Sequence, residues 1–324
     1  MFLKKLIISG LLFLLFSGFV KEGDFPRARI SNGLIKAELY LPDKTNGYYR
    51  GTRFDWGGVM PELEYKGHHF FGQWFPEYNP TLHDAIMGPV EEFSVLGFNE
   101  AAVGAEFLKI GVGTLLKPDD NAYSFARTYE VKNGGKWKVK KRKNRIEFTH
   151  ELTDATGYAY RYKKIVRLVK GKTEMVLEHS LKNIGRKSIE TSVYNHNFFV
   201  IDKEPTNENM KMSFPFEVSA EGRGFGTTAL TENKSITYTR SLAKGESVFS
   251  AGLKGLGDTA ADYDITIQNL KSGAGVRITA DQPIDKLVYW ACSTTACPEP
   301  YIKLSVKSGE TINWKINYDF SVSK

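Results

Sequence analysis

Apolar and polar residues alternate with a period of two over long stretches of this chain, and this alternation strongly limits the folds it can adopt. In the stretch 311–320 every second residue is apolar, and the residues between them are polar. A similar alternation begins at Met175. Because successive side chains of a β-strand point to opposite faces, the pattern predicts strands with one buried face.

Further candidate strands follow one another at short intervals, separated by Gly, Asn and Ser turn residues. Outside the N-terminal segment, no stretch of ten or more residues has a convincing helical period. The chain also has no Pro/Ser-rich linker, charge block or visible repeat, so we expect a single all-β domain over residues 23–324, a large antiparallel β-sandwich. The candidate strands lie at 123–131, 145–152, 160–169, 189–201, 211–218, 263–270, 275–279, 286–291 and 302–306.

The N-terminal segment has the pattern of a secretory signal peptide. Lys4 and Lys5 precede an apolar run over residues 6–20, which is shorter than the ~20 residues of a typical membrane-spanning helix. We therefore expect a signal peptide over residues 1–22 and a mature protein that is periplasmic or secreted and not inserted in a membrane. A retained membrane anchor is the alternative interpretation of the same run.

Charge and cysteine content restrict the classes of partner. The net charge of +7 is partly carried by the leader, and the remaining excess is scattered, which argues against nucleic acid. The densest basic stretch, 136–145, is expected to be a solvated hairpin face next to the turn 133–135. Cys292 and Cys297 can form a disulfide or stay free, and without matching histidines they predict no metal site. The sequence leaves the oligomeric state open.

Two short segments place unusual polar residues among apolar ones. His196 lies at the end of an alternating run and is followed by Phe198 and Phe199, so its imidazole is a candidate for proton transfer near neutral pH. Glu299 lies between two prolines, which restrict the backbone on what we expect to be a stiff loop. Burial there would raise the pKa of the carboxyl group and suit it to general base catalysis. A structural histidine and a solvated loop glutamate are the alternatives.

These two segments resemble the paired signature of the galactose mutarotase, or aldose 1-epimerase, family, in which an Asn-His precedes aromatic residues and a Glu lies beside a Pro late in the chain. The stretch from Leu82 to Gly88, with His83, resembles the family's Leu-His-Gly-Gly segment, and Arg53 is placed like the family's sugar-binding arginine. The resemblance extends over about 28–320 and implies the sandwich fold of that family. Here Asp84 and Ala85 replace the two glycines.

The resemblance also implies a mechanism. Glu299 would remove the proton of the anomeric hydroxyl group, while His196 protonates the ring oxygen of the sugar, so that the ring opens and closes on either face. No metal and no organic cofactor would be required. Arg53, His83 and Asn195 would contact the carbohydrate, which would be a free aldose or the end of a sugar chain. The family's acidic hydroxyl-binding residue has no clear counterpart, and Asp202 is only a weak candidate.

Further residues are candidates for the wall of the site. Glu91 and Glu92 either line it, with Glu92 as the candidate, or form a solvated pair. Trp74 has the context of a loop residue and is our candidate for stacking on a sugar, although any single Trp is more often part of the core. A non-catalytic carbohydrate-binding protein with the same fold is the alternative function, because a scaffold does not determine activity.

Overall fold

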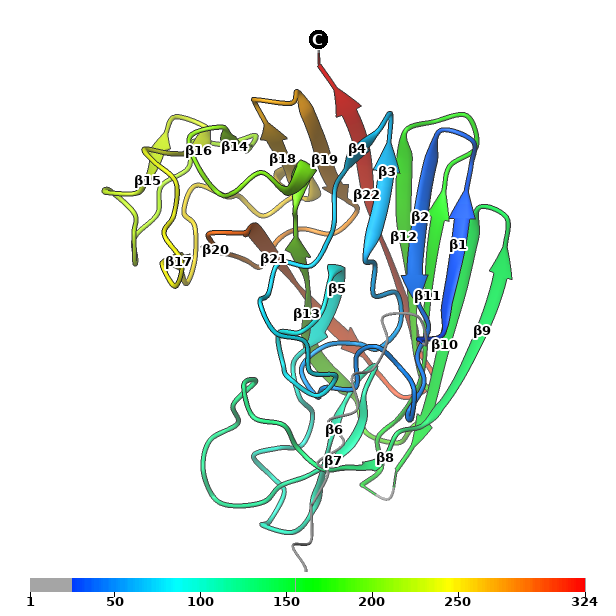
Figure 1. The fold of residues 1–324 in the computed structure, drawn as a ribbon. Coiled ribbons are helices and arrows are strands. Elements are labelled where there is room, and N and C mark those ends of the chain that lie inside the picture. Colours follow the sequence, from blue (N-terminus) through cyan, green and yellow to red (C-terminus); the bar gives the residue numbers. More distant parts are fainter. Residues whose placement is uncertain (1–24, 155, 324) are drawn as a thin grey trace, which may run out of the picture.

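The computed structural model describes residues 25–154 and 156–323, which form β-strands and connecting loops with two short 3₁₀ turns (Figure 1). The predicted signal peptide, residues 1–22, lies outside this range. No helix in the described part of the chain is long and apolar enough to cross a membrane. The elements are β1 Arg27–Ser31, β2 Ile35–Tyr40, β3 Glu62–Tyr65, β4 His68–His69, β5 Gly88–Phe93, β6 Glu106–Lys109, β7 Gly113–Leu116, β8 Val131–Asn133, β9 Lys136–Arg142, β10 Arg145–Thr153, β11 Ala159–Leu168, β12 Glu174–Asn183, β13 Ile189–Phe198, η1 Ile201–Lys203, β14 Met210–Ser213, β15 Ala229–Glu232, β16 Ser235–Tyr238, β17 Ser247–Ser250, η2 Ala260–Asp262, β18 Asp264–Asn269, β19 Ala274–Ala280, β20 Lys286–Cys292, β21 Thr295–Val306 and β22 Thr311–Val322.

Two large antiparallel sheets dominate the described residues. One has ten strands in the order β15-β16-β14-β18-β19-β22-β12-β11-β10-β9, and the other has five in the order β17-β20-β21-β13-β5. Smaller sheets, β1-β2-β3-β4 and β6-β7-β8, pack beside them. Figure 1 shows the five-stranded sheet facing the curved sheet that contains β9 to β12 and β22. The architecture is the all-β sandwich that the alternating pattern predicts.

The main core lies between these two sheets. The ring of Phe93 at the end of β5 meets the rings of Tyr162 on β11 and Trp314 on β22 at centroid distances of 5.2 and 6.4 Å. Since neighbouring residues of a strand alternate between faces, Phe93 and Glu91 point into this core, while Glu92 points to the outer face of the five-stranded sheet. This alternation positions the site described below.

A buried network of charged residues crosses the same core. Lys164 on β11 forms ion pairs with Asp55, at 2.8 Å, and with Glu91 on β5. His179 on β12 completes the network, with Nε2 lying 2.7 Å from Glu91 Oε1. Burial by itself would raise the pKa of Glu91, but Lys164 and His179 outweigh it and lower that pKa to about 2.

Most of the predicted strands are present, but the one at 123–131 is wrong. Only Val131 belongs to a strand, and the preceding residues form an irregular loop. The aromatic residues that suggested a strand instead pack on each other locally, with Tyr123 and Tyr129 stacked at 5.5 Å. The predicted strand at 211–218 is also too long, because β14 ends at Ser213.

The prediction of a loop around Glu299 is wrong as well, because this residue lies inside β21. Pro298 and Pro300 have no N–H to donate, and the pairing of β21 with β13 is interrupted beside them. Regular pairing stops at Tyr194 and Tyr301 and resumes only at an isolated bridge between Phe199 and Ala296. Glu299 therefore lies at an opening in the ladder.

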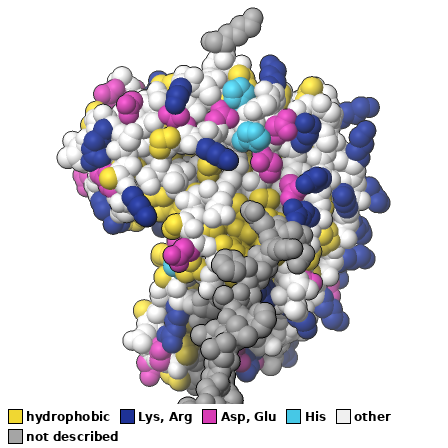
Figure 2. All heavy atoms as spheres, viewed as in Figure 1, with side chains coloured by type: hydrophobic (Ala, Val, Ile, Leu, Met, Phe, Trp, Pro, Cys, Tyr) yellow, Lys and Arg dark blue, Asp and Glu magenta, His cyan; other side chains and the backbone are white. Residues whose placement is uncertain are grey.

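The basic stretch forms the exposed strand β9 at one end of the described ten-stranded sheet, and its hairpin with β10 turns after Arg142. Figure 2 shows lysine and arginine side chains spread along this edge. Exposed charges on an edge strand disfavour pairing with a second chain. The two cysteines are free within the described residues, with Cys297 buried on β21.

Candidate active site

His196 and Glu299 lie side by side on the outer face of the five-stranded sheet. His196 comes from β13 and Glu299 from the adjacent strand β21, and the register of the two strands places these residues opposite each other. His196 Nε2 lies 3.3 Å from Glu299 Oε1, and both side chains are buried. The two groups are thus close enough to exchange a proton.

Burial sets the protonation of this pair. It raises the pKa of Glu299 to about 8, although the positive charge of Arg53 opposes the shift. Burial also lowers the pKa of His196 well below its ordinary value, and Arg53 lowers it further. At neutral pH the pair therefore holds one proton, which rests on the carboxyl group of Glu299 beside a neutral imidazole.

This protonation has a consequence for stability. Folded Glu299 keeps its proton up to about pH 8, whereas the unfolded carboxyl group loses it near its ordinary pKa of 4.5, so the free energy of unfolding falls as pH rises between these values. Glu299→Gln mimics the protonated group and removes this loss. We expect the variant to be more stable than the wild type at pH 9, by several kcal/mol, and little different at pH 4. Urea unfolding at both pH values measures this, and parallel pH dependence of the two proteins would contradict it.

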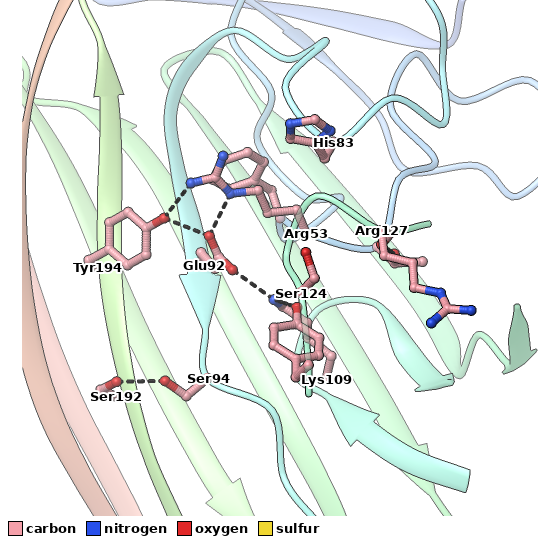
Figure 3. A network of polar contacts seen from close by, with 12 residues as sticks. Arg53, His83, Glu92, Ser94, Lys109, Ser124, Arg127, Ser192 and Tyr194 are labelled. Atoms are coloured by element: carbon pink, nitrogen blue, oxygen red, sulfur yellow. Dashed lines mark hydrogen bonds and ion pairs between the residues drawn. The ribbon is translucent and has the colours of Figure 1, made fainter. Parts of the chain in front are cut away.

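Arg53 organises the other end of the site (Figure 3). Its Nε donates to Glu92 Oε2 at 2.7 Å, and one terminal nitrogen donates to the Tyr194 hydroxyl group at 3.0 Å. The other terminal nitrogen forms an ion pair with Asp84. The guanidinium carbon also lies 4.1 Å from the centre of the Phe125 ring. Arg53 is therefore held rigidly by contacts to four separate segments of the chain.

Glu92 also forms an ion pair with a second cation, the buried Lys109. Lys109 on β6 donates to Glu92 Oε1 at 2.9 Å and to the Tyr123 hydroxyl group at 2.7 Å. Burial alone would raise the pKa of Glu92, but Lys109 and Arg53 lower it to about 2. Glu92 is consequently an ionised acceptor at all physiological pH values, which suits it to accept a hydrogen bond from a hydroxyl group.

Arg53, Glu92, Tyr194, His196 and Glu299 line one cavity of about 530 Å³, a volume typical of small-molecule sites. Aromatic rings form part of its wall, with polar groups between them. Close to it, Ser94 and Ser192 form a hydrogen bond of 2.7 Å (Figure 3). The lining residues are Arg53, Asp84, Glu92, Phe93, Ser94, Val95, Tyr123, Phe125, Tyr194, His196, Phe249, Ala251, Lys286, Val288, Trp290, Glu299 and Tyr301.

Four of the predicted site residues converge on this cavity, namely Arg53, Glu92, His196 and Glu299. A solvated pair of glutamates is excluded, because Glu91 and Glu92 are buried on opposite faces of β5. The cavity wall is thus made from segments more than 240 residues apart in the sequence, which only the folded chain brings together.

Three other predicted residues do not line the cavity. Asn195 points to the opposite face of β13, where its amide lies 3.3 Å from Glu91 Oε1. Trp74 packs behind the wall, stacked on Phe198 at 4.8 Å with its indole N–H bonded to a backbone carbonyl group. His83 lies at the rim, with Nε2 3.1 Å from Asp84 Oδ2.

The weak candidate Asp202 also lies elsewhere. It contacts His68 Nδ1 at 2.9 Å and the backbone N–H of His69. With these contacts it borders a separate cavity of about 950 Å³. The acidic groups beside Arg53 are Asp84 and Glu92 instead.

Sequence reasoning missed several lining residues. Tyr194 and Tyr301 lie two positions from His196 and Glu299, so strand periodicity was a usable signal that they share the same face. Trp290 lines the cavity where Trp74 was expected. No sequence signal pointed to Phe125, whose loop reaches the site only through the tertiary fold.

Comparison with known proteins supports the fold. No protein-family model matches the chain, and no curated protein matches its sequence. Solved structures do match: a protein from Synechocystis sp. PCC 6803 has a TM-score of 0.56 at 14% identity, covering 93% of this chain and 97% of that chain. The galactose mutarotase related enzyme from Lactobacillus acidophilus has a TM-score of 0.55 at 14% identity, covering 92% and 98%.

A galactose mutarotase-like protein from Clostridium acetobutylicum has a TM-score of 0.53 at 14% identity, covering 92% of this chain and 95% of that chain. At such low identity the likeness concerns the fold, and it extends over nearly the whole length of both partners in each of these three comparisons. The chain therefore has the galactose mutarotase-like fold, as the resemblance of its short motifs predicted.

Proposed function

We propose that this protein is an exported aldose 1-epimerase-like isomerase that interconverts the α and β anomers of a sugar. The observation that carries the proposal is the buried contact of 3.3 Å between His196 and Glu299 on the wall of a sugar-sized cavity. Two groups of different proton affinity beside one cavity are what opening and closing a hemiacetal ring requires. The predicted signal peptide supports a periplasmic or secreted location.

The proposed reaction moves two protons. In the reactive form of the pair the shared proton has moved from Glu299 to His196 across their contact of 3.3 Å, so Glu299 is ionised. Glu299 then takes the proton of the anomeric hydroxyl group while the ring oxygen accepts a proton from His196, and the bond between C1 and the ring oxygen breaks to give the open aldehyde. Rotation about the bond between C1 and C2 then presents either face of the aldehyde to the ring hydroxyl group. Ring closure reverses both proton transfers. Arg53 and Glu92 hold sugar hydroxyl groups in place through charge-assisted hydrogen bonds.

The raised pKa of Glu299 predicts the pH dependence of the reaction. The proposed reaction needs the pair to hold one proton, which His196 delivers to the ring oxygen, so the catalysed rate should fall as pH rises through an apparent pKa near 8, where the pair loses that proton. Initial rates of mutarotation between pH 6 and 9.5, corrected for the uncatalysed reaction, measure this. A rate that rises through pH 8 would contradict the proposal, because it would mean that the pair is active without its shared proton.

A sugar-binding protein without turnover is the second candidate, and Asp84 favours it. Asp84 stands in place of a glycine of the family's motif. Its carboxylate forms an ion pair with one terminal nitrogen of Arg53, so that nitrogen is less available to a sugar. In that case the cavity binds a sugar while His196 and Glu299 do not transfer protons.

The experiment that separates the two candidates uses mature protein and a panel of free aldoses. Exchange between anomers is followed by polarimetry or NMR, and binding is measured separately by titration calorimetry. Acceleration for at least one aldose supports the isomerase. Binding without acceleration for any aldose supports the sugar-binding protein.

A further inference from the structure

The charged groups of the cavity balance one another except at Lys286. Arg53 and Lys109 are both paired with Glu92, and Arg53 is also paired with Asp84. The ammonium group of Lys286, by contrast, has no ion pair among the described residues, although it lines the same cavity. With Lys109 buried beside Glu92, the cavity and its wall hold three cations against the carboxylates of Asp84 and Glu92, and protonated Glu299 adds no charge.

The position of Lys286 is well defined. It lies on β20 directly opposite Tyr301 of β21, and its Nζ lies 4.3 Å from the centre of the Tyr301 ring. That ring in turn stacks on Tyr194 at 4.1 Å. A cation held over an aromatic ring keeps its charge and its outward donors, so the ammonium group stays available to a ligand.

Lys286 also lies at a useful distance from the reacting pair. Val288 is the β20 residue opposite Glu299, and Lys286 is two positions earlier on the same face. Two residues along a strand span about 7 Å. A substituent on the side of a sugar ring away from C1 can therefore reach Lys286 while C1 lies beside Glu299.

We propose that Lys286 binds a negatively charged substituent of the sugar, a carboxylate or a phosphate group, and makes this an anionic-sugar site. The inference deepens the proposed function and rests on it for the placement of C1. An unpaired lysine beside a ligand site attracts anions through charge-assisted hydrogen bonds. Neutral aldoses would leave this cation without a partner.

The test compares galacturonate and glucose 6-phosphate with galactose and glucose as substrates of mutarotation. For the wild type we expect kcat/KM to be at least about tenfold higher for one of the anionic sugars. Lys286→Gln should lose about tenfold of kcat/KM for that sugar, mainly through a higher KM, and Lys286→Arg should retain most of it. The preference should weaken as salt concentration rises.

Lys303→Gln is the matched control. Lys303 is exposed on the neighbouring strand β21, but its Nζ is paired with Asp285 Oδ1 at 2.5 Å and it does not line the cavity. We expect this variant to keep the wild-type preference. An equal loss in both variants would overturn the proposal, because it would show a general effect of surface charge.

The outcomes distinguish this proposal from that of the reaction itself. Mutarotation of neutral sugars at least as fast as of anionic ones, unchanged in Lys286→Gln, would overturn the role of Lys286 and leave the isomerase standing. No turnover, but calorimetric binding of an anionic sugar that weakens about tenfold in Lys286→Gln, would support Lys286 and reject the isomerase. Preference for galacturonate or for glucose 6-phosphate identifies the anion.

Discussion

Replacing Glu299 by Gln is expected to reduce the catalysed rate of mutarotation by about 10³-fold, within the range that general acid–base groups contribute. The amide keeps the shape of the side chain but cannot take a proton from the anomeric hydroxyl group. His196→Ala is expected to cause a loss of similar size, because His196 Nε2 is the partner of the carboxyl group at 3.3 Å. Initial rates of anomer exchange, measured with the sugar that the wild type uses best, test both variants.

The double variant sharpens this test. If the two groups act as one proton-transferring unit, Glu299→Gln combined with His196→Ala should be scarcely slower than either single variant. Glu190→Gln serves as control, because Glu190 is an exposed residue of β13 away from the cavity. Rates within threefold of the wild type in both single variants would rule out the proposed acid–base roles.

Removing the buried lysine is expected to have the largest effect on stability. Lys164→Met would leave the carboxylates of Asp55 and Glu91 buried without their shared cation. Breaking a buried ion pair in this way costs about 3–5 kcal/mol, which for a domain of this size lowers Tm by on the order of 10 °C. Differential scanning calorimetry or chemical unfolding at pH 7 measures the loss.

Lys163→Met is the matched control for that variant. Lys163 is the preceding residue of β11 and points to the other, partly exposed face of the strand. We expect its replacement to change stability by less than about 1 kcal/mol. Equal destabilisation by the two substitutions would mean that the buried network does not contribute as described.

Strand positions could be predicted well where alternation was long and regular. The stretches that became β10, β11 and β22 have one buried face along their whole length, and their patterns show it. The stretch 123–131 has similar residue types, yet its rings pack locally in a loop. Local sequence does not distinguish these two cases, because both satisfy the need to bury aromatic surface.

The candidate site could be predicted in part for a related reason. Short motifs drew attention to His196, Glu299 and Arg53, which do line one cavity. The same motifs suggested Asn195, but alternation along β13 turns it to the opposite face. Applying the two-residue period to the motif would have selected Tyr194 in its place.

By itself, the sequence determined that this chain forms strands and which residues of a strand share a face, because the side-chain period is a local property of extended backbone. Only the tertiary structure decided which strands became neighbours. The placement of Glu299 beside His196, and of Lys109 behind Glu92, depends on pairing between strands far apart in the chain. The tertiary structure also decided the raised pKa of Glu299, because that pKa depends on burial, and burial is a property of the packed molecule.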